Sequence, residues 1–150
     1  MLILDVITIL CIGLMTGNEL AVSLFVNPAI WQLEDRAQAA ILRILARSLG
    51  KAMPVWYIAS LILMGIEAFL HRQQSSLPWL LAAIALWIAI ILYTVTSLVP
   101  INNRVAALDP AHLPDGWSAE HRTWDARHRF RILVLVLASA SLTCGLLIAR

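Results

Sequence analysis

The chain has 150 residues, of which 61% are hydrophobic and 13% charged, and its formal net charge is +2. Soluble domains carry roughly 25% charged residues. This composition, with a mean hydropathy of +0.82, therefore indicates an integral membrane protein. So small a charge excludes the large cationic surface of a nucleic-acid-binding protein, and we expect no nucleic-acid partner. The length predicts a single domain, residues 1–150.

Four apolar segments are long enough to cross a bilayer as helices, which takes roughly 20 residues each. In chain order they cover about residues 2–26, 53–70, 77–99 and 132–149. The first is longer than a secretory signal and has no basic start, so we expect it to be a retained helix. The predicted fold class is all-α, an integral membrane antiparallel four-helix bundle.

The connections between the spans differ in character. Residues 27–52 combine apolar residues at helical spacing with four basic side chains, Arg36, Arg43, Arg47 and Lys51. They predict an amphipathic interfacial segment, which either lies flat in the membrane interface or continues into the second span with a bend at Pro54. The sequence HRQQSS predicts a short turn between spans two and three. Residues 100–131 hold Pro110, Pro114 and Gly116, and we expect this connection to contain the least regular backbone of the chain.

The basic residues predict an orientation. The two longer connections and the starts of the following spans hold Arg36, Arg43, Arg47, Lys51, Arg104, Arg122, Arg127, Arg129 and Arg131, whereas the other side holds Arg72 and Arg150. Because positive residues favour the cytoplasmic side, we expect both longer loops in the cytoplasm and both termini outside. The expected location is a bacterial inner membrane.

Small residues recur at four-residue spacing on three spans: Gly13, Gly17 and Ala21; Ala85 and Ala89; Ser141 and Gly145. Such ridges allow membrane helices to approach closely, where lipid supplies no hydrophobic drive. The alternative is that alanine and glycine are simply common in membrane helices, and for any single ridge we favour that interpretation.

One face of the first span is polar, which is costly in a membrane. Thr16, Glu19, Ser23 and Asn27 follow one another at three- and four-residue steps. Such a face must point into the protein, and Glu19 needs a partner there. The candidates at similar depth are Tyr93, Thr94, Thr96, His128 and Arg131.

Two other acidic residues belong to the opposite side of the membrane. Asp5 is expected at the interface. Glu67 precedes His71 by four residues, so an ion pair within the helix can satisfy it, and we favour a structural role.

A second polar face lies in the stretch HRTWDARHRFR. If helical, this stretch places His121, Trp124, His128 and Arg131 on one stripe, with Arg122, Arg127 and Arg129 on other faces. Tryptophan and arginine favour headgroup depth, so one interpretation is an interfacial belt. The other is a site directed inward, towards Glu19, Asn27 and Asn102.

Three motifs carry a resemblance to a known family: FVNPAIW after the first span, LVPINNRVA after the third, and a tryptophan followed by RHRFR at the start of the fourth. Together they resemble the anthrone-oxygenase-like family of small four-helix membrane proteins. The resemblance implies a membrane-bound oxygenase that uses molecular oxygen to oxidise lipophilic aromatics such as anthrones. The family's polar motif positions correspond to Asn27, Pro28, Trp31, Pro100, Asn102, Asn103, Arg104, Trp124, His128 and Arg131.

That chemistry needs a base and a dry pocket. His128 is the expected general base because an unperturbed imidazole titrates near neutrality, with Glu19 and Arg131 beside it as catalytic residues. The expected substrate-binding residues are Asn27, Trp31, Asn102, Asn103, Arg104 and Trp124. Asparagine and arginine side chains can hold an oxyanion, and the two tryptophans can flank a planar ring.

Molecular oxygen is the expected co-substrate, and no resident cofactor is predicted. The less favoured alternative is iron or copper held by Glu19 and His128. It is less favoured because His121 and His128 are two turns apart on a helix and cannot chelate one ion together.

Other functions stay open at this point. The bundle could bind a lipid, quinone or other hydrophobic ligand without catalysis, or form a subunit of a transporter or larger complex. The expected partners are the lipid bilayer and a small lipophilic aromatic or lipid-like ligand, and a homo-oligomer is possible. The sequence has no phosphate-binding glycine loop and no G-x-S-x-G motif.

Overall fold

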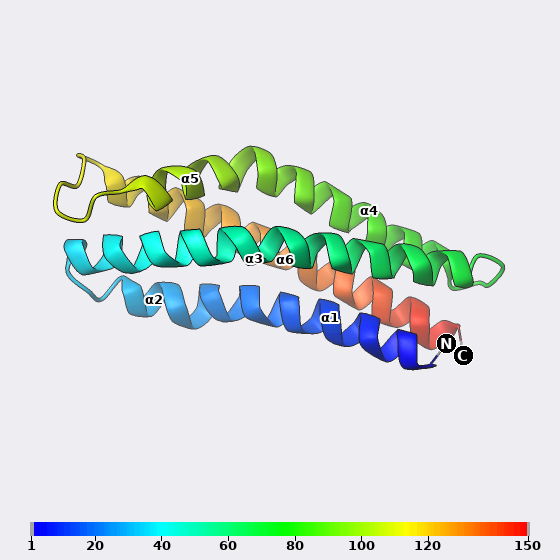
Figure 1. The fold of residues 1–150 in the computed structure, drawn as a ribbon. Helices are drawn as coiled ribbons and strands as arrows, with labels where there is room; N and C mark the ends of the chain where they lie inside the picture. Colours follow the sequence, from blue (N-terminus) through cyan, green and yellow to red (C-terminus); the bar gives the residue numbers. More distant parts are fainter. Residues whose placement is uncertain (1, 150) are drawn as a thin grey trace.

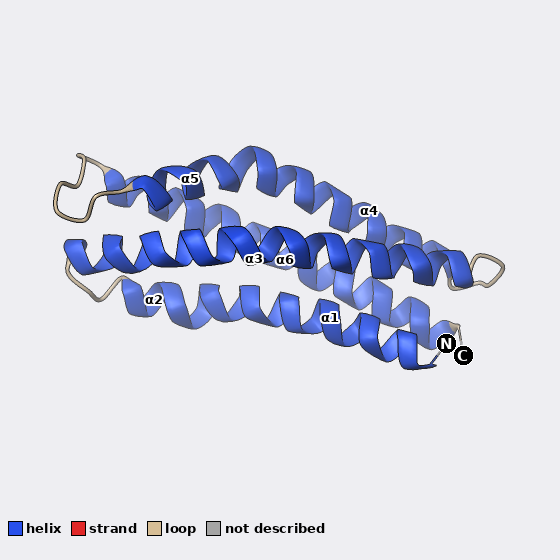
Figure 2. Ribbon diagram, in the orientation of Figure 1, coloured by secondary structure: helices blue, strands red, loops and turns tan. Residues whose placement is uncertain are grey.

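The protein is a bundle of four long helical rods that run antiparallel, as seen in a computed structural model that describes residues 2–149 (Figure 1). The rods are, in order, α1 (Leu2–Ala21) with η1 (Val22–Val26) and α2 (Asn27–Ile30); α3 (Asp35–Leu70); α4 (Leu77–Tyr93) with η2 (Thr94–Leu98) and α5 (Val99–Ala107); and α6 (Trp117–Ile148). Helices and loops make up the whole of this described range, with no strand (Figure 2). The predicted all-α antiparallel bundle is confirmed.

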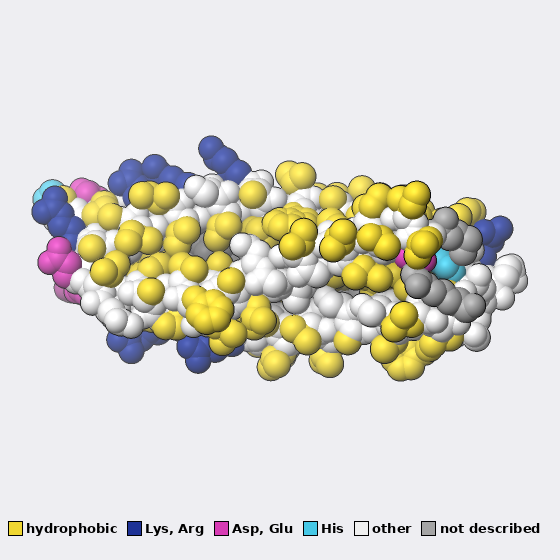
Figure 3. Space-filling view, turned by 90° about the horizontal axis from the view of Figure 1, so that it is seen from below, with side chains coloured by type: hydrophobic (Ala, Val, Ile, Leu, Met, Phe, Trp, Pro, Cys, Tyr) yellow, Lys and Arg dark blue, Asp and Glu magenta, His cyan; other side chains and the backbone are white. Residues whose placement is uncertain are grey.

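All four rods are long and apolar enough to cross a membrane. Large apolar side chains cover much of the outer surface, and many of them are more than half exposed, such as Ile3, Leu14 and Val55. On the face in Figure 3, Lys and Arg side chains gather towards the end that carries the loops at 31–34 and 108–116. A surface of this kind has to be covered by lipid, which makes the chain an integral membrane protein.

The connections are shorter than the sequence predicted. The amphipathic segment after the first span continues without a break into the second, so that it forms the first part of α3, and Pro54 lies inside that helix. Residues 100–131 contain the longest non-helical stretch of the described chain, 108–116, as predicted, although α5 extends to Ala107 and α6 begins at Trp117. Pro100 stands in the first turn of α5, where a missing N–H costs no helical hydrogen bond. Gly116, at φ 75°, provides the left-handed residue that starts α6.

Two π-helical segments interrupt the first and third rods, each directly before a proline. In η1 the N–H of Asn27 donates to the carbonyl of Val22, and in η2 the N–H of Val99 donates to that of Thr94, five residues back in both cases. A proline ring clashes with the carbonyl four residues earlier in a regular α-helix, so a widened turn before it relieves the clash. Both segments pack on α6, and π turns of this kind are frequent at functional sites.

The buried apolar side chains form two clusters along the bundle axis. The first lies in the half that contains the termini and includes Ile12, Met64, Trp87 and Leu142. The second lies in the half with the loops at 31–34 and 108–116; its members are Val22, Ile30, Ala39, Leu42, Leu98, Ile101, Val105, Trp117 and Trp124. Polar residues of α1 and α6 stand at the junction of the two clusters.

Of the small-residue ridges, only the one on α6 lies at a tight helix contact. A Cβ on Gly145 would come 2.9 Å from Leu80 Cδ2 and 3.1 Å from Trp79 Cβ of α4. One turn earlier, the Ser141 hydroxyl donates to the Trp79 carbonyl. Gly13 and Gly17 have open space where a Cβ would stand, and they are exposed, so their ridge makes no tight contact within the described bundle.

Replacing Gly145 by leucine should therefore separate α4 from α6. The expected loss of stability is about 1–3 kcal/mol, as for other overpacked sites. Gly13→Leu is the matched control, because it adds the same side chain to a helical glycine that faces outward, and it should not lower stability. Unfolding of the detergent-solubilised protein measures both, and equal losses would contradict the packing described.

Candidate functional site

A cavity of about 360 Å³ lies in the half of the bundle with the loops at 31–34 and 108–116. Its apolar walls come largely from α3, including Leu42, Leu45, Leu49 and Met53. The polar residues that line it are Asn18, Glu19, Asn27, Tyr57, Thr94, Asn102, Asn103, His121, Trp124 and Arg131. Its volume falls within the range of small-molecule sites, about 300–1,000 Å³.

A buried ion pair joins α1 to α6 beside the cavity. Arg131 Nη2 donates to Glu19 Oε2 at 2.5 Å, and the two residues are only 6% and 3% exposed. Tyr57 of α3 donates its hydroxyl to Glu19 Oε1 at 3.4 Å, and the Tyr57 ring packs on Trp87. The partner that Glu19 requires is thus Arg131, with help from Tyr57, which the sequence did not single out.

His128 contacts both partners of this ion pair. Arg131 Nη2 lies 2.8 Å from His128 Nδ1, and a guanidinium can only donate, so Nδ1 accepts. The proton of the neutral imidazole is then on Nε2, which lies 3.2 Å from the Glu19 carbonyl oxygen and donates to it. Both ring nitrogens are occupied, the residue is fully buried, and it does not line the cavity. This arrangement disfavours His128 as the base that meets a substrate.

The stripe predicted on the fourth span is a column of stacked rings. Trp124 lies nearly parallel to His121 at 5.5 Å and to His128 at 4.5 Å between ring centroids. His121 in turn contacts Trp31 at 5.1 Å, and the guanidinium of Arg122 lies over the Trp31 ring. All four residues of the stripe are buried, so it is directed inward, in agreement with the second interpretation above.

Asp125 is a further buried residue of this region that sequence reasoning missed. It accepts a hydrogen bond from the Asn27 side chain at 2.8 Å and pairs with Arg129 at 2.8 Å. The sequence could have indicated it, because a residue directly after Trp124 on a helix lies beside the inward stripe. The contact fixes the end of the first rod, just after η1, against α6.

Four buried polar atoms beside the cavity have no hydrogen-bond partner among the described residues. They are His121 Nε2, Trp124 Nε1, Arg131 Nε and Thr94 Oγ1, and all four residues line the cavity. Buried polar atoms in folded proteins are nearly always hydrogen-bonded, so such a group calls for an explanation. A ligand with polar atoms that enters the cavity would satisfy them.

Most of the predicted site residues come together at the cavity. Those that line it are Glu19, Asn27, Asn102, Asn103, Trp124 and Arg131. Trp31 does not line it and stacks on His121 instead, so it cannot flank a ligand there together with Trp124. Arg104 is exposed and pairs with Glu120 at 2.9 Å, away from the cavity lining.

The atoms that the metal alternative would use are held by a guanidinium. Glu19 Oε2 and His128 Nδ1 lie 3.5 Å apart, and Arg131 Nη2 contacts both. An iron or copper ion between them would have to displace Arg131, whose positive charge already balances Glu19. The residues present at this place therefore do not fit a metal ion well.

Comparison with known proteins gives one match. The family model described as anthrone oxygenase matches residues 39–141, which is more than half of the chain. The chain belongs to the anthrone oxygenase family. Searches of curated proteins and of solved structures found no match.

Some of the residues around the cavity lie within the matched range, and others lie before it in the sequence. It contains most of α3, all of α4, η2 and α5, and most of α6, and thus Tyr57, Asn102, His121, Trp124 and Arg131. Glu19 and Asn27 lie before it, on the first rod. The anthrone oxygenase match therefore covers the arginine of the buried ion pair but not its carboxylate.

Glu19→Gln should destabilise the bundle because it leaves the Arg131 charge buried without a counter-charge. Breaking one side of a buried pair costs about 3–5 kcal/mol. Arg131→Met should cost a similar amount, and the double variant less than the sum of the two. A double-mutant cycle by unfolding in detergent measures this coupling.

The exposed pair Arg104–Glu120 is the matched control for this cycle. Its side chains are 55% and 46% exposed, so Arg104→Met and Glu120→Gln should show a coupling of about 0–1 kcal/mol. A coupling for Glu19–Arg131 as small as that of the control pair would contradict the role given to the buried pair.

Proposed function

We propose that this protein is a membrane-bound oxygenase that oxidises a small, lipophilic, anthrone-like aromatic with molecular oxygen in the cavity between α3 and α6. Family membership supports an oxygenase-like function at the family level. The observation that carries the proposal for this chain is the set of buried polar atoms on the cavity wall that have no hydrogen-bond partner among residues 2–149. An apolar cavity with a few such atoms suits a flat hydrocarbon that carries one or two oxygens.

The proposed reaction converts a ring CH₂ to a carbonyl. A base removes one proton from this carbon, and the remaining carbanion, stabilised as an enolate-type oxyanion, passes electrons to O₂. The C–O bond that forms gives a hydroperoxide. Loss of water from the hydroperoxide leaves the quinone carbonyl, so that one O₂ yields one C=O and one H₂O.

His121 is the residue best placed to act as the base. Its Nε2 is buried beside the cavity and has no hydrogen-bond partner in the described part of the chain, so it can take up a proton in the tautomer protonated at Nδ1. Trp124 Nε1 and Arg131 Nε, also without partners there, are the donors for the developing oxyanion. In this proposal Glu19 and His128 are positioning residues, because they hold Arg131.

A lateral opening suits a substrate that arrives from the bilayer. Ile58 of α3 and Val95 of η2 both line the cavity, and both are 57% exposed on the outer surface. The third rod packs on α3 through α4 and α5, on either side of η2. A lipophilic molecule can therefore pass between α3 and η2 without crossing water.

His121→Asn should abolish substrate-dependent oxygen uptake, with a loss of at least about 100-fold in kcat, because the general base is removed. His128→Asn should lower activity through misplacement of Arg131 and should also destabilise the bundle. His121→Asn should cost less stability, because it removes ring contacts but no hydrogen bond of Nε2 to a described residue. Oxygen consumption with anthrone in detergent micelles, together with unfolding curves, measures both. Full activity in His121→Asn would remove His121 from the proposed role.

Val95→Trp should narrow the lateral opening and raise KM for an anthrone supplied in lipid vesicles, with kcat little changed. Leu92→Trp is the matched control, because Leu92 is 62% exposed one turn away on the same rod and does not line the cavity. An equal effect of both substitutions on KM would argue against entry between α3 and η2.

The alternative function is binding of a lipid or quinone without catalysis, which the lateral opening and the apolar walls also suit. Native mass spectrometry of the purified protein separates the two. A tightly held lipid or quinone, with no oxygen uptake by the unaltered protein on any anthrone tested, would favour the alternative.

A further inference from the structure

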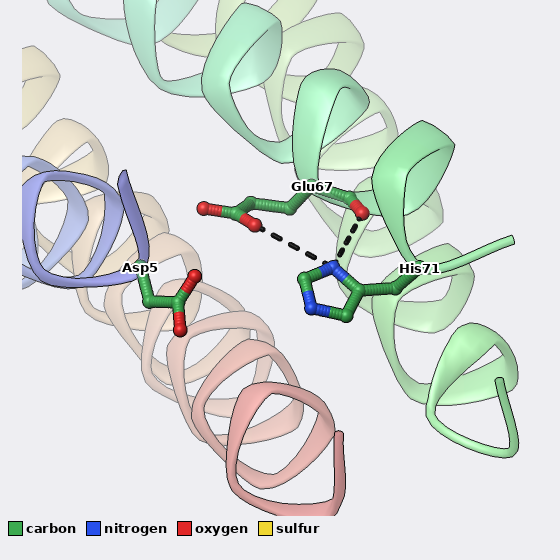
Figure 4. Close-up of side chains that lie close together, drawn as sticks. All are labelled: Asp5, Glu67 and His71. Atoms are coloured by element: carbon green, nitrogen blue, oxygen red, sulfur yellow. Dashed lines mark hydrogen bonds and ion pairs between the residues drawn. The ribbon is translucent and has the colours of Figure 1, made fainter. Parts of the chain in front are cut away.

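A second group of buried ionisable side chains lies at the other end of the bundle, where the chain termini meet (Figure 1). Asp5 in the first turn of α1, Glu67 in the last turn of α3 and His71 directly after α3 form what we call the termini-end cluster. Their exposed fractions are 5%, 0% and 1%. Each offers one ligand atom, and these three atoms lie within 4.8 Å of one another. In Figure 4 the two carboxylates and the imidazole face one shared space.

The sequence spacing accounts for this convergence. Glu67 and His71 are four residues apart, so they stand on one side of α3, as predicted, with His71 Nδ1 3.6 Å from Glu67 Oε2. Asp5 was expected at the membrane interface, but the packing of α1 on α3 buries it. Thr8, one turn further along α1, donates its hydroxyl to Glu67 Oε1 at 2.9 Å.

The hydrogen bonds of His71 and Glu67 leave lone pairs available. His71 Nδ1 lies 2.9 Å from the Glu67 carbonyl oxygen, which can only accept, so Nδ1 carries the proton and Nε2 keeps its lone pair. Histidines that bind metals almost always donate their other N–H to a carbonyl or carboxylate in this way. Glu67 Oε2, fully buried, accepts no hydrogen bond among the described residues, while Oε1 is oriented by Thr8.

We propose that the termini-end cluster binds one divalent transition-metal ion of the Zn²⁺, Fe²⁺ or Mn²⁺ class. One imidazole nitrogen with two carboxylate oxygens is a donor set that these ions accept, whereas Ca²⁺ and Mg²⁺ prefer oxygen alone. Metal–ligand bonds of about 2.0–2.2 Å place donors up to about 4.4 Å apart, so small side-chain rotations close the site. Two carboxylates and a neutral imidazole match the charge of a divalent ion.

The proposed metal site is separate from the cavity, and a bound ion would affect the packing of α1 on α3. Its ligands come from the start of α1 and the end of α3, so a bound ion clamps these two rods together at the end remote from the cavity. Binding to the folded protein alone stabilises it by linkage, so metal should raise Tm. The proposal does not depend on the oxygenase activity, and either can fail without the other.

The test uses the full chain in detergent, without a polyhistidine tag and with an unaltered N-terminus. After treatment with EDTA, Co²⁺ or Zn²⁺ is titrated in. We expect one Co²⁺ per chain, a visible absorption band of Co²⁺ with nitrogen and oxygen ligands, and a rise in Tm with Zn²⁺. No saturable binding of either ion, with Tm unchanged, would overturn the proposal.

Two isosteric variants assign the binding to the cluster. Glu67→Gln and Asp5→Asn should each weaken Co²⁺ binding by at least about 100-fold, since each removes an anionic ligand. Asp125→Asn is the matched control: it neutralises a buried carboxylate at the other end of the bundle and should leave Co²⁺ affinity unchanged. Unchanged affinity in Glu67→Gln would overturn the site.

A measurement on the unaltered protein keeps the test decisive if these variants do not fold. X-ray absorption of the Co²⁺-loaded chain should show one imidazole together with oxygen ligands. A spectrum with no imidazole contribution would exclude the cluster as the place of binding.

Discussion

The buried ion pair between Glu19 and Arg131 is the contact on which the cavity-containing half of the bundle depends. An isolated charge at this depth is costly, so α1 and α6 have to pair these two groups wherever the rods meet. Arg131 also contacts His128, and that contact fixes which ring nitrogen carries the proton. His128 stacks on Trp124, and Trp124 on the next imidazole along α6. One electrostatic requirement thus orders a whole wall of the cavity.

The cavity itself follows from a difference between the rods. The second rod is one unbroken helix, whereas the first and third widen into π turns before Pro28 and Pro100. A π turn shifts the faces of the helix that follows it, so residues after the proline no longer continue the packing of those before it. Two apolar clusters result, and the polar residues lie where they join. The NP and VP dipeptides are therefore structural causes of the site as well as motif positions.

The sequence predicted the fold well because four apolar spans allow few arrangements in lipid. It also predicted the inward faces of Glu19 and Arg131, since helical periodicity decides which residues share a side. It could not show that Trp31, Arg104 and His128 lie outside the cavity lining, because distances between rods depend on packing that no local pattern encodes. The π turns were missed for a related reason: a proline after a span was taken as an end of the helix, although the chain could widen one turn and continue.

The distribution of polar atoms around the cavity constrains how any ligand would lie there. The donors and the acceptor nitrogen that have no partner in the described part of the chain stand mainly on α6, at His121, Trp124 and Arg131. The facing wall of α3 is almost entirely apolar. Both faces of the Trp124 ring are taken by imidazoles, so a ligand meets its edge and its N–H. A flat aromatic would then place its oxygen at α6 and its rings against α3. Molecular oxygen, itself apolar, would concentrate on that same apolar side, next to the ring carbon that the proposed base deprotonates.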